Sequence, residues 1–343
     1  MPENILIIKP SALGDIATAL PVLSTIRKNF PRARISWLVR REFASILELA
    51  DGLDEIVIFD RKRLDKWWCS PVIFKELAVF LRGLYAAEYD MVIDLQGLFR
   101  TGFFSWLTAS PKRFGMDKSR EFASMFYTDR IILDSRCVHV IDYYLKVARR
   151  AGCDKIVTSV DLEPPDAAVK ALSELLESDG IEPDNYAVFI PTASDMSKCW
   201  PLEKFEQAAS FINSEYSMDV IATGTASDKE YIDRMIKPGK GIYNLAGRTD
   251  IHQLVALLKN ARLVLSNDTG PGQIASVLSV PMVMIVGNTN PRRIGPYGRL
   301  QFCAAVDPLG RDESVFNPKP EYGIENISVD TVLKMAEILL KGR

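Results

Sequence analysis

The 343-residue chain lacks several features that would assign it to a special class of protein. It has two histidines, His139 and His252, which lie too far apart in sequence to suggest a histidine-based metal site. Its five cysteines form no CxxC pair, and such a scattered, odd set is typical of reduced thiols in a cytosolic protein. No stretch reaches the roughly 18 apolar residues that a membrane-spanning helix needs. Because the chain opens directly on an apolar strand pattern, we expect no signal peptide.

Common motifs for nucleotide binding and hydrolysis are missing as well. The chain has no GxGxxG fingerprint and no Walker A sequence, so NAD binding and P-loop chemistry lose their main support. It has no GxSxG elbow of an α/β-hydrolase. A net charge of −2 provides no general basic field, which argues against nucleic acid as the partner.

What the chain does have is an alternation of strand and helix patterns. Apolar residues make up 48% and charged residues 25%, as in ordinary globular proteins. In the first half, the expected strands are residues 4–9, 35–39, 55–59 and 91–94, and the expected helices are residues 16–30, 43–50, 74–87, 119–127 and 139–151. Residues 10–15 are expected to form a loop. Such alternation predicts a doubly wound α/β sheet.

A polar segment with two prolines, residues 162–166, interrupts this pattern and is the expected linker. After it the alternation restarts, with expected strands at residues 186–190, 218–222, 261–265 and 280–286 and expected helices at residues 202–213, 229–236, 251–259, 274–278 and 329–341. A chain of this length suggests two cores. We therefore expect two Rossmann-like domains, residues 1–162 and 163–343, with a ligand-binding cleft between them. The last helix is free to pack back on the first domain.

One segment carries the clearest ligand-binding pattern. Residues 266–273 (Ser-Asn-Asp-Thr-Gly-Pro-Gly-Gln) form a polar turn between an apolar strand and an apolar helix. Ligands of open α/β sheets bind at such strand ends, and a helix N-terminus favours phosphate. The alternative is that Asp-Thr-Gly only caps the helix. The local pattern does not decide between the two.

Three other segments carry candidate functional side chains. Asp15 follows the first strand and is either a general base or a helix cap. The basic run at residues 61–68, with two tryptophans, is either a solvated loop or, with Arg120, a site for an acidic substrate. Residues 191–201 follow the first strand of the second domain, and their hydroxyls and Lys198 favour a phosphate over the alternative of helix capping.

Together these segments resemble family 9 glycosyltransferases, the bacterial heptosyltransferases. The similar segments are residues 7–15 (Ile-Ile-Lys-Pro-Ser-Ala-Leu-Gly-Asp) with Leu20-Pro21, residues 92–98 (Val-Ile-Asp-Leu-Gln-Gly-Leu) and the Asp268-Thr269-Gly270 turn. Residues 61–68 and 115–127 resemble the heptosyltransferase I branch of the family. The similarity spans nearly the whole chain.

The resemblance implies a GT-B architecture, two Rossmann-like domains with the site between them, and assigns roles to individual residues. Asp15 matches the catalytic base, and Lys198 matches the lysine on the donor phosphates. The implied donor-binding residues are Thr192, Ala193, Lys198, Thr249, Asp268, Thr269, Gly270 and Gln273. The implied acceptor-binding residues are Ser11, Gly14, Arg61, Arg63, Lys66 and Arg120. In two positions the chain departs from the family: Gln273 stands where a histidine is common, and Ala193 stands where a hydroxyl is frequent.

The implied reaction is an inverting transfer of L-glycero-D-manno-heptose from ADP-heptose to the Kdo of lipid A, with no metal and no other cofactor. An acceptor of this kind implies a cytoplasmic protein held peripherally at the inner face of the inner membrane. The basic and aromatic run or the helix at residues 72–85 would supply that contact. Two alternatives stay open: a GT-B transferase with another nucleotide sugar or acceptor, and a non-catalytic protein that binds a sugar nucleotide.

Overall fold

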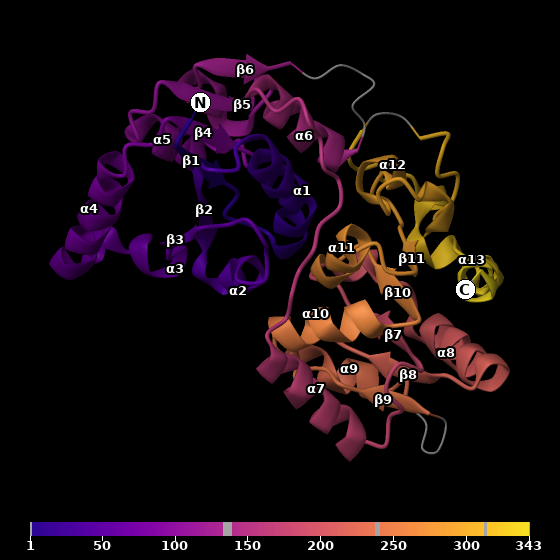
Figure 1. Ribbon diagram of the computed structural model, residues 1–343. Helices are drawn as coiled ribbons and strands as arrows, with labels where there is room; N and C mark the ends of the chain where they lie inside the picture. The colour runs from indigo at the N-terminus through magenta and orange to yellow at the C-terminus, as the bar shows by residue number, and fades with distance from the viewer. Residues whose placement is uncertain (1, 133–138, 237–240, 312–313, 343) are drawn as a thin grey trace. The chain divides into compact units, whose positions relative to one another are not determined.

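Residues 2–132, 139–236, 241–311 and 314–342 are described by a computed structural model (Figure 1). The chain divides into two units, residues 1–161 and 162–343, and each unit has its own sheet. The division falls at the start of the polar, proline-bearing segment that the sequence marks as a linker. The described helices include none that is long and apolar enough to span a membrane.

The first unit alternates strands with helices along the chain. Its strands are β1 (Asn4–Ile8), β2 (Arg34–Arg40), β3 (Glu55–Phe59), β4 (Met91–Asp94), β5 (Lys112–Met116) and β6 (Asp129–Ile131). Its α-helices are α1 (Leu13–Asn29), α2 (Ala44–Leu47), α3 (Arg61–Leu64), α4 (Pro71–Ala86), α5 (Phe99–Leu107) and α6 (Val140–Arg150). Its described residues also form the 3₁₀ helices η1 (Arg41–Phe43), η2 (Trp67–Cys69) and η3 (Arg120–Phe126).

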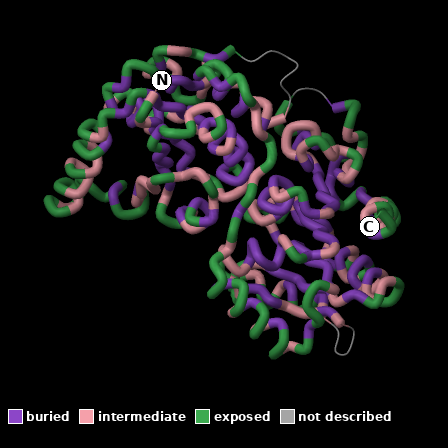
Figure 2. The backbone as a smooth tube through the Cα atoms, in the orientation of Figure 1, coloured by how far each residue is buried: buried purple, intermediate pink, exposed green. Residues whose placement is uncertain are grey.

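The six strands of the first unit form one parallel sheet in the order β3-β2-β1-β4-β5-β6. β1 lies in the middle, and its residues from Ile5 to Ile8 are completely buried (Figure 2). Leu6 and Ile8 belong to a buried cluster with residues of α4 and α5. A strand covered on both faces must be apolar at every position, which explains the unbroken apolar run in the sequence.

The second unit repeats this plan. Its strands are β7 (Tyr186–Ile190), β8 (Asp219–Ala222), β9 (Ile242–Asn244), β10 (Leu263–Asn267), β11 (Met282–Ile285) and β12 (Cys303–Ala304). Its α-helices are α7 (Asp166–Ser178), α8 (Leu202–Tyr216), α9 (Lys229–Asp233), α10 (Ile251–Asn260), α11 (Gly270–Val277), α12 (Pro291–Ile294) and α13 (Val329–Lys341). The 3₁₀ helices are η4 (Met196–Lys198), η5 (Ala226–Asp228), η6 (Leu300–Phe302), η7 (Pro320–Tyr322) and η8 (Ile324–Asn326).

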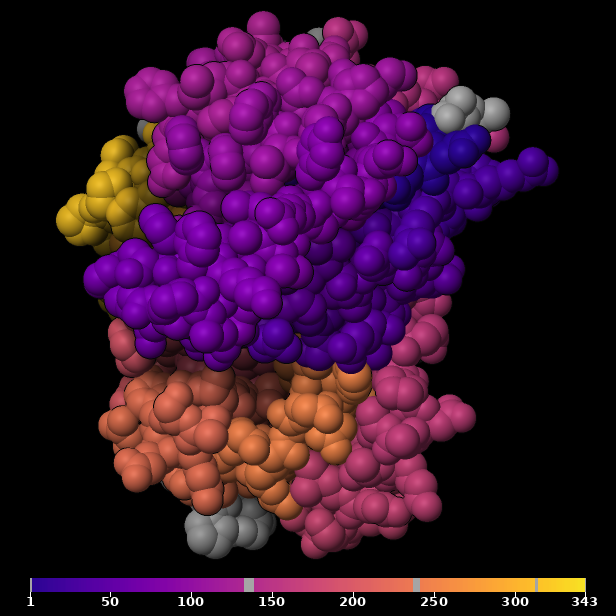
Figure 3. All heavy atoms as spheres, turned by 90° about the vertical axis from the view of Figure 1, so that its left-hand side faces the viewer, coloured from indigo at the N-terminus to yellow at the C-terminus, as the bar shows by residue number. Residues whose placement is uncertain are grey.

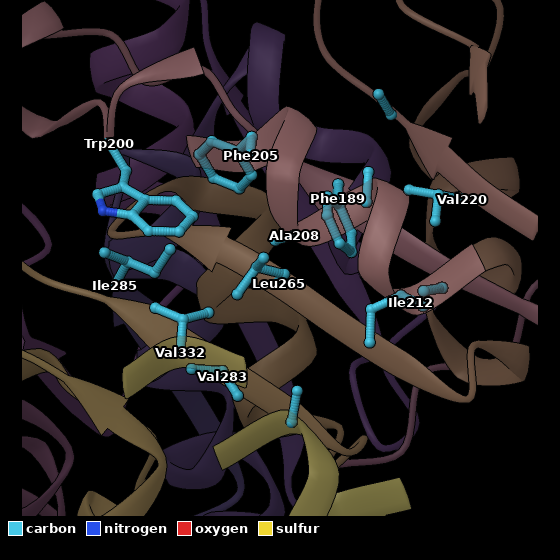
Figure 4. Close-up of a cluster of buried hydrophobic side chains, with 14 of the residues drawn as sticks. Phe189, Trp200, Phe205, Ala208, Ile212, Val220, Leu265, Val283, Ile285 and Val332 are labelled. Carbon is cyan, nitrogen blue, oxygen red and sulfur yellow. The ribbon is translucent and has the colours of Figure 1, made fainter. Parts of the chain in front are cut away.

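The second sheet is also parallel, in the order β12-β11-β10-β7-β8-β9. Numbered from its own first strand, it has the same 3-2-1-4-5-6 order as the first sheet, which is the Rossmann order. One face carries a cluster built around Trp200, Phe205 and Phe189 (Figure 4). Val332 and Leu340 of α13 belong to this cluster, so the last helix packs on the second unit's own core, where the sequence had left its partner open.

Three segments for which the sequence predicts a loop or a helix have a different local structure. The expected loop at residues 10–15 ends early, because α1 begins at Leu13 and takes Gly14 and Asp15 into its first turn. The basic run at residues 61–68 is no loop but contains α3 and η2. The helix expected at residues 119–127 is a kinked 3₁₀ segment, because Glu121 and Phe122 have positive φ angles of 53° and 60°.

Candidate functional site

Each sheet has a point at which the strand order reverses. In the first unit it lies between β1 and β4, and in the second unit between β7 and β10. Ligands of open parallel sheets bind at the carboxyl ends of the strands beside such a point. The segments that follow these four strands contain Ser11, Gly14 and Asp15 in the first unit and the Thr192–Lys198 and Asp268–Gln273 stretches in the second. The topology therefore gives most of the predicted site residues a position suited to ligand binding.

In the first unit, Asp15 is paired with Lys9, the lysine that directly follows β1. Lys9 Nζ lies 3.4 Å from Asp15 Oδ2. The backbone N–H of Ala12 is also 3.4 Å from this oxygen, and the Ser11–Ala12 peptide bond is cis. Asp15 stands at the third position of α1 rather than at its N-cap, and its side chain is 53% exposed. One carboxylate oxygen, Oδ2, is thus held by Lys9 and the Ala12 N–H, while the side chain stays accessible to solvent.

Lys9 was not singled out from the sequence as a functional residue. It is buried, and its Nζ lies 5.3 Å from the centre of the Tyr144 ring of α6. Burial alone would lower the pKa of the Lys9 ammonium, but the interactions with Tyr144 and Asp15 outweigh it, so the pKa is raised. Lys9 therefore remains a cation at neutral pH. A lone charge at the end of an otherwise apolar strand is the sequence signal that could have identified it.

Asp94, at the end of β4, is the second acidic side chain beside this switch point. It is fully buried, and its Oδ1 accepts hydrogen bonds from the backbone N–H groups of Gln96 at 2.8 Å and Gly97 at 3.2 Å. The Tyr127 hydroxyl donates to Oδ2 at 2.8 Å. Burial raises the pKa of the Asp94 carboxyl, although these hydrogen bonds oppose the rise. Asp94 thus fixes the turn after β4 and has no exposed oxygen for a substrate.

The predicted acceptor-binding cations are distributed between ion-paired and unpaired side chains. Arg61 Nε lies 3.1 Å from Asp65, and Arg63 binds both carboxylate oxygens of Glu76. No ion pair of Lys66 or Arg120 occurs among the residues that the structure describes. These four side chains follow β3 and β5, at the same edge of the sheet as Asp15. No described contact joins them to Asp15.

In the second unit, Lys198 and Asp268 come together across the switch point. Lys198 Nζ lies 2.8 Å from Asp268 Oδ2. Lys198 ends η4 after β7, whereas Asp268 follows β10, so the pair joins the two loops that flank the β7–β10 junction. The Asp268 side chain is 12% exposed, and that of Lys198 is 36% exposed. An ammonium group has three donors. Lys198 can therefore bind an anionic ligand without leaving Asp268.

Gln273 completes this pair from the first turns of α11. Its Nε2 lies 3.2 Å from Asp268 Oδ1 and 2.8 Å from the carbonyl oxygen of Ile294. The side chain is buried and also touches the Met284 sulfur. Both N–H donors of the amide are thus used, one on a carboxylate and one on a carbonyl. A glutamine at this position holds Asp268 by one hydrogen bond, whose donor is an amide N–H and not a titratable group.

The sequence of the turn before α11 left open whether it binds a ligand or caps the helix, and the structure has features of both. Thr269 is the N-cap, and its Oγ1 accepts a hydrogen bond from the Gly272 N–H at 3.2 Å. Pro271 has no N–H, so the first turn has fewer free donors than its glycines suggest. Asp268 does not cap the helix, since its carboxylate binds Lys198 and Gln273. Positive charge at this edge therefore comes mainly from Lys198, with the helix N-terminus as a second contribution.

Asn267, the last residue of β10, lies in the 266–273 segment but was not predicted to be a site residue. It is completely buried, and its Nδ2 donates to the Pro191 carbonyl at 2.9 Å. Its Oδ1 accepts from the Trp200 N–H at 3.0 Å. Asn267 therefore fastens both ends of the 191–200 loop to β10 and sets the position of Lys198. No side chain caps α8, so helix capping does not explain the polar residues of this loop.

The remaining predicted donor residues have simpler surroundings. Thr192 is buried directly after β7, and Ala193 follows it. Thr249 lies half-buried before α10, whose N-cap is Asp250. No described hydrogen bond of the Thr192 or Thr249 hydroxyl ties either to the Lys198–Asp268 pair. A search of the described side chains found no group of three His, Cys, Asp or Glu that could hold a metal ion.

Comparison with known proteins identifies the family. The model of glycosyltransferase family 9 (heptosyltransferase) matches residues 77–319. The chain belongs to this family. It is 27% identical over 304 residues to lipopolysaccharide heptosyltransferase 1 of Salmonella typhimurium, which covers 88% of this chain and 93% of the relative. The chain is accordingly a glycosyltransferase of the heptosyltransferase kind.

Solved structures agree with the fold. A family 9 glycosyltransferase from Veillonella parvula has a TM-score of 0.82 at 22% identity and covers 99% of this chain and 98% of its own. The E. coli heptosyltransferase WaaC, solved with ADP, has a TM-score of 0.78 at 24% identity and covers 98% and 99%. These likenesses and the two parallel Rossmann sheets confirm the expected GT-B fold class. The cleft between the domains and the roles of single residues stay predictions.

Proposed function

We propose that this glycosyltransferase moves L-glycero-D-manno-heptose from ADP-heptose to the Kdo of lipid A with inversion at the anomeric carbon. The observation that carries the proposal is the Lys198–Asp268–Gln273 network at the β7–β10 switch point, because it offers a fixed cation where a donor pyrophosphate would bind. The E. coli relative holds ADP, and the Salmonella relative is a lipopolysaccharide heptosyltransferase. The first supports an ADP-linked donor, and the second supports a lipopolysaccharide precursor as the acceptor.

In the proposed mechanism, Asp15 is the general base. Lys9 binds its Oδ2, so Oδ1 is free to accept the proton of an acceptor hydroxyl. The acceptor oxygen then forms a bond to the anomeric carbon from the face opposite the pyrophosphate. General bases of this type accelerate reactions about 10²- to 10⁴-fold. Because the Lys9 cation is buried, it holds the carboxylate in place and disfavours its reorientation.

The leaving group departs toward the second unit's cation. As the bond between the anomeric carbon and the phosphate oxygen breaks, its electron pair stays on ADP. Lys198, with the N-terminus of α11, stabilises the charge that develops there. Gln273 and Asp268 keep the ammonium in position. In this proposal the protein residues alone supply the electrostatic stabilisation, and neither a metal nor another cofactor is required.

The acceptor assignment rests on the cations that follow β3 and β5. A Kdo-bearing lipid is anionic, and arginine can bind carboxylate or phosphate through two parallel hydrogen bonds. In the structure Arg61 and Arg63 are held by Asp65 and Glu76, so an anionic acceptor must compete with these carboxylates. Lys66 and Arg120 carry no such described partner. A lipid acceptor also places the enzyme at the cytoplasmic face of the inner membrane.

The decisive test is a transfer assay with ADP-heptose and Kdo-lipid A, in which the rate is measured by the release of ADP. We expect Asp15→Asn to lower kcat by about 10²- to 10⁴-fold and to leave ADP affinity unchanged. Asp51→Asn, on an exposed loop of the same unit, is the matched control and should retain full activity. Full activity of Asp15→Asn would refute the base assignment.

Nucleotide titrations separate the alternatives. Calorimetry with ADP, UDP and GDP should show selective binding of ADP, and Lys198→Ala should weaken it at least tenfold because a charged hydrogen bond to phosphate is lost. A preference for UDP or GDP would keep the family assignment and exclude ADP-heptose as the donor. Binding of ADP-heptose without turnover of any acceptor would favour a non-catalytic protein.

A further inference from the structure

One helix of the first unit, α4, has an apolar side that none of the unit's described residues covers. The inner side of α4 packs on the sheet through Leu84 and through Ile73, Leu77 and Phe80. On its other side, Val72, Phe74, Val79 and Tyr85 are all more than half exposed. α4 projects at the left of Figure 1, and this side of the unit faces the viewer in Figure 3. An ordinary surface helix would carry polar residues there.

Two basic residues share this exposed side. Helical spacing places Lys75 and Arg82, seven residues apart, between the exposed apolar residues. We call these six residues (Val72, Phe74, Lys75, Val79, Arg82 and Tyr85) the α4 outer face. The single acidic residue of α4, Glu76, is bound to Arg63. No carboxylate partner of Lys75 or Arg82 occurs among the described residues. The face is therefore apolar and cationic.

Two tryptophans extend this face at the N-terminal end of α4. Trp68 of η2 is 74% exposed and Trp67 is 46% exposed. The Trp67 ring lies 6.2 Å from the ring of Phe74, centre to centre, which joins η2 to the α4 outer face. Tryptophans of this kind are enriched at the boundary between lipid headgroups and acyl chains. Large contiguous exposed apolar patches mark interaction sites.

Charge distinguishes between the possible occupants. Residues 60–87 contain six basic and three acidic side chains, a local net charge of +3 in a chain whose total is −2. All three acids are bound to arginines of the first unit, namely Asp60 to Arg41, Asp65 to Arg61 and Arg100, and Glu76 to Arg63. A symmetric dimer through this face would bring like charges together. An anionic lipid surface instead meets cations and apolar side chains with complementary chemistry.

We propose that the α4 outer face, with Trp67 and Trp68, is the docking surface for a bilayer that contains anionic lipids. The apolar side chains enter the boundary between headgroups and acyl chains, and Lys75, Arg82 and Lys66 remain at the phosphates. The proposal rests on the proposed function in one respect: it names the membrane from which that function would take its lipid acceptor. Docking itself requires no sugar nucleotide, so it can be measured separately from transfer.

The test is co-sedimentation of the full chain with vesicles, without nucleotide. One set contains phosphatidylcholine alone, and the other contains phosphatidylcholine with phosphatidylglycerol. We expect binding to the anionic vesicles, weakened by salt. Lys75→Ala with Arg82→Ala should lower the partition constant by about 30-fold, or about fivefold for each cation. Val72→Glu with Val79→Glu should lower it further, because both apolar insertion and charge attraction are lost.

Matched controls lie on α13. Ile338 and Lys334 are exposed there, so Ile338→Glu and Lys334→Ala change the same chemistry at a place outside the α4 outer face and should bind vesicles like the wild type. All variants should keep wild-type circular dichroism and ADP affinity, since every altered side chain is exposed. A variant that loses vesicle binding while it keeps ADP affinity supports the proposal.

Three results would overturn it. The wild type could fail to bind anionic vesicles at all. It could bind both lipid compositions equally, with no effect of the α4 substitutions. Finally, gel filtration could show a dimer that Val72→Glu with Val79→Glu dissociates, which would make the face an interface between copies of the chain. None of these outcomes would affect the result of the transfer assay with Asp15→Asn. The docking proposal and the proposed function can therefore be refuted independently of each other.

Discussion

Gln273 illustrates how a single buried amide can order a charged pair. Its two N–H donors bind Asp268 and the Ile294 carbonyl, so the carboxylate that holds Lys198 has one fixed orientation. A histidine at this position, as the family resemblance leads one to expect, would change charge near neutral pH. Glutamine does not titrate. The donor network of this chain therefore keeps its charge through the range in which a histidine would lose a proton.

Replacement of this amide by an acid of the same shape gives a prediction with a defined pH dependence. In Gln273→Glu, an ionised carboxylate would face Asp268 and the Ile294 carbonyl, and like charges repel. We expect the KM for the donor to rise at least tenfold at pH 8. Protonation of the new carboxyl restores one donor, so the defect should shrink as pH falls toward 5. Gln207→Glu, on the exposed side of α8, is the control. A defect independent of pH would contradict this account.

Asp94 permits a prediction on stability. Its folded pKa lies above the ordinary value of 3.8 because the carboxyl is buried. The native state thus binds this proton more tightly than the unfolded state, and its contribution to the free energy of unfolding falls as pH rises from about 3.8 through the folded pKa. Asp94→Asn cannot titrate. In urea unfolding between pH 4 and 8, the stability of wild type relative to Asp94→Asn should therefore decrease with pH. Parallel curves would refute the assignment.

Single residues were predictable where chemistry and position coincide in the sequence. Asp15, Lys198 and Asp268 follow apolar strands, and the structure places all three beside switch points. Lys9 was overlooked although its charge follows an unbroken apolar run. Asn267 could not be found in this way, because its partners Pro191 and Trp200 are distant in sequence. Sequence shows which side chains end a strand. It does not show which of these side chains are buried in the folded protein.

At the scale of elements, the contact between β10 and α11 leaves no space for a side chain at Gly272. A Cβ there would lie 2.9 Å from the Asn267 carbonyl oxygen and would collide with Ser266 Oγ. Gly272→Ala must therefore shift the turn that carries Asp268. We expect a loss of about 1–3 kcal/mol in the free energy of unfolding and weaker ADP binding. Denaturation and calorimetry measure the two effects.

Gly83 in α4 provides the matched control. An added Cβ there meets no heavy atom within 4 Å, and the position is helical. Gly83→Ala should stabilise the chain by about 0.5–1 kcal/mol, because alanine favours the helix. If Gly272→Ala were equally harmless, the turn would be more adaptable than its contacts indicate.

Elements were predictable in proportion to the strength of their apolar pattern. The expected helix at residues 329–341 has the bounds of α13, and the expected strand at residues 55–59 has those of β3. β5 escaped prediction because its sequence is Lys-Arg-Phe-Gly-Met, and β12 because it has two residues. η3 departs from its expected helix through contacts with α5. Glu121 accepts from the Phe99 N–H, and Phe126 and Ala123 leave no space for a Cβ at Gly102. Such contacts are not encoded in local periodicity.

For the whole molecule, two units with separate sheets predict a response to donor that is confined to one of them. ADP at 100 times its dissociation constant adds about 2.7 kcal/mol to the stability of the unit that binds it. In hydrogen exchange of the full chain, we expect protection to increase at residues 191–200 and 268–273. Strands β1 and β4 should show no change with ADP alone. Equal protection of both units would mean that they unfold as one, contrary to separate cores.

The two-unit plan itself followed from the sequence, because the apolar alternation stops at residues 162–166 and then restarts. The repeated strand order was not predictable, since periodicity identifies strands but not their neighbours. The preference for a parallel sheet with right-handed crossovers restricts the choices without selecting one. The order 3-2-1-4-5-6 in both units is what brings the ends of the first and fourth strands together.

The central place of β1 has a consequence for biosynthesis. β1 leaves the ribosome before β4, the strand that pairs with one of its edges and ends at Asp94. At about 5–20 residues per second, that partner emerges roughly 4 to 17 seconds later. Throughout this interval the nascent chain carries a strand that is apolar from Ile5 to Ile8 and has an open edge, a feature prone to pair with another chain. The strand at the centre of the folded sheet is thus also a segment exposed to aggregation while the protein is being made.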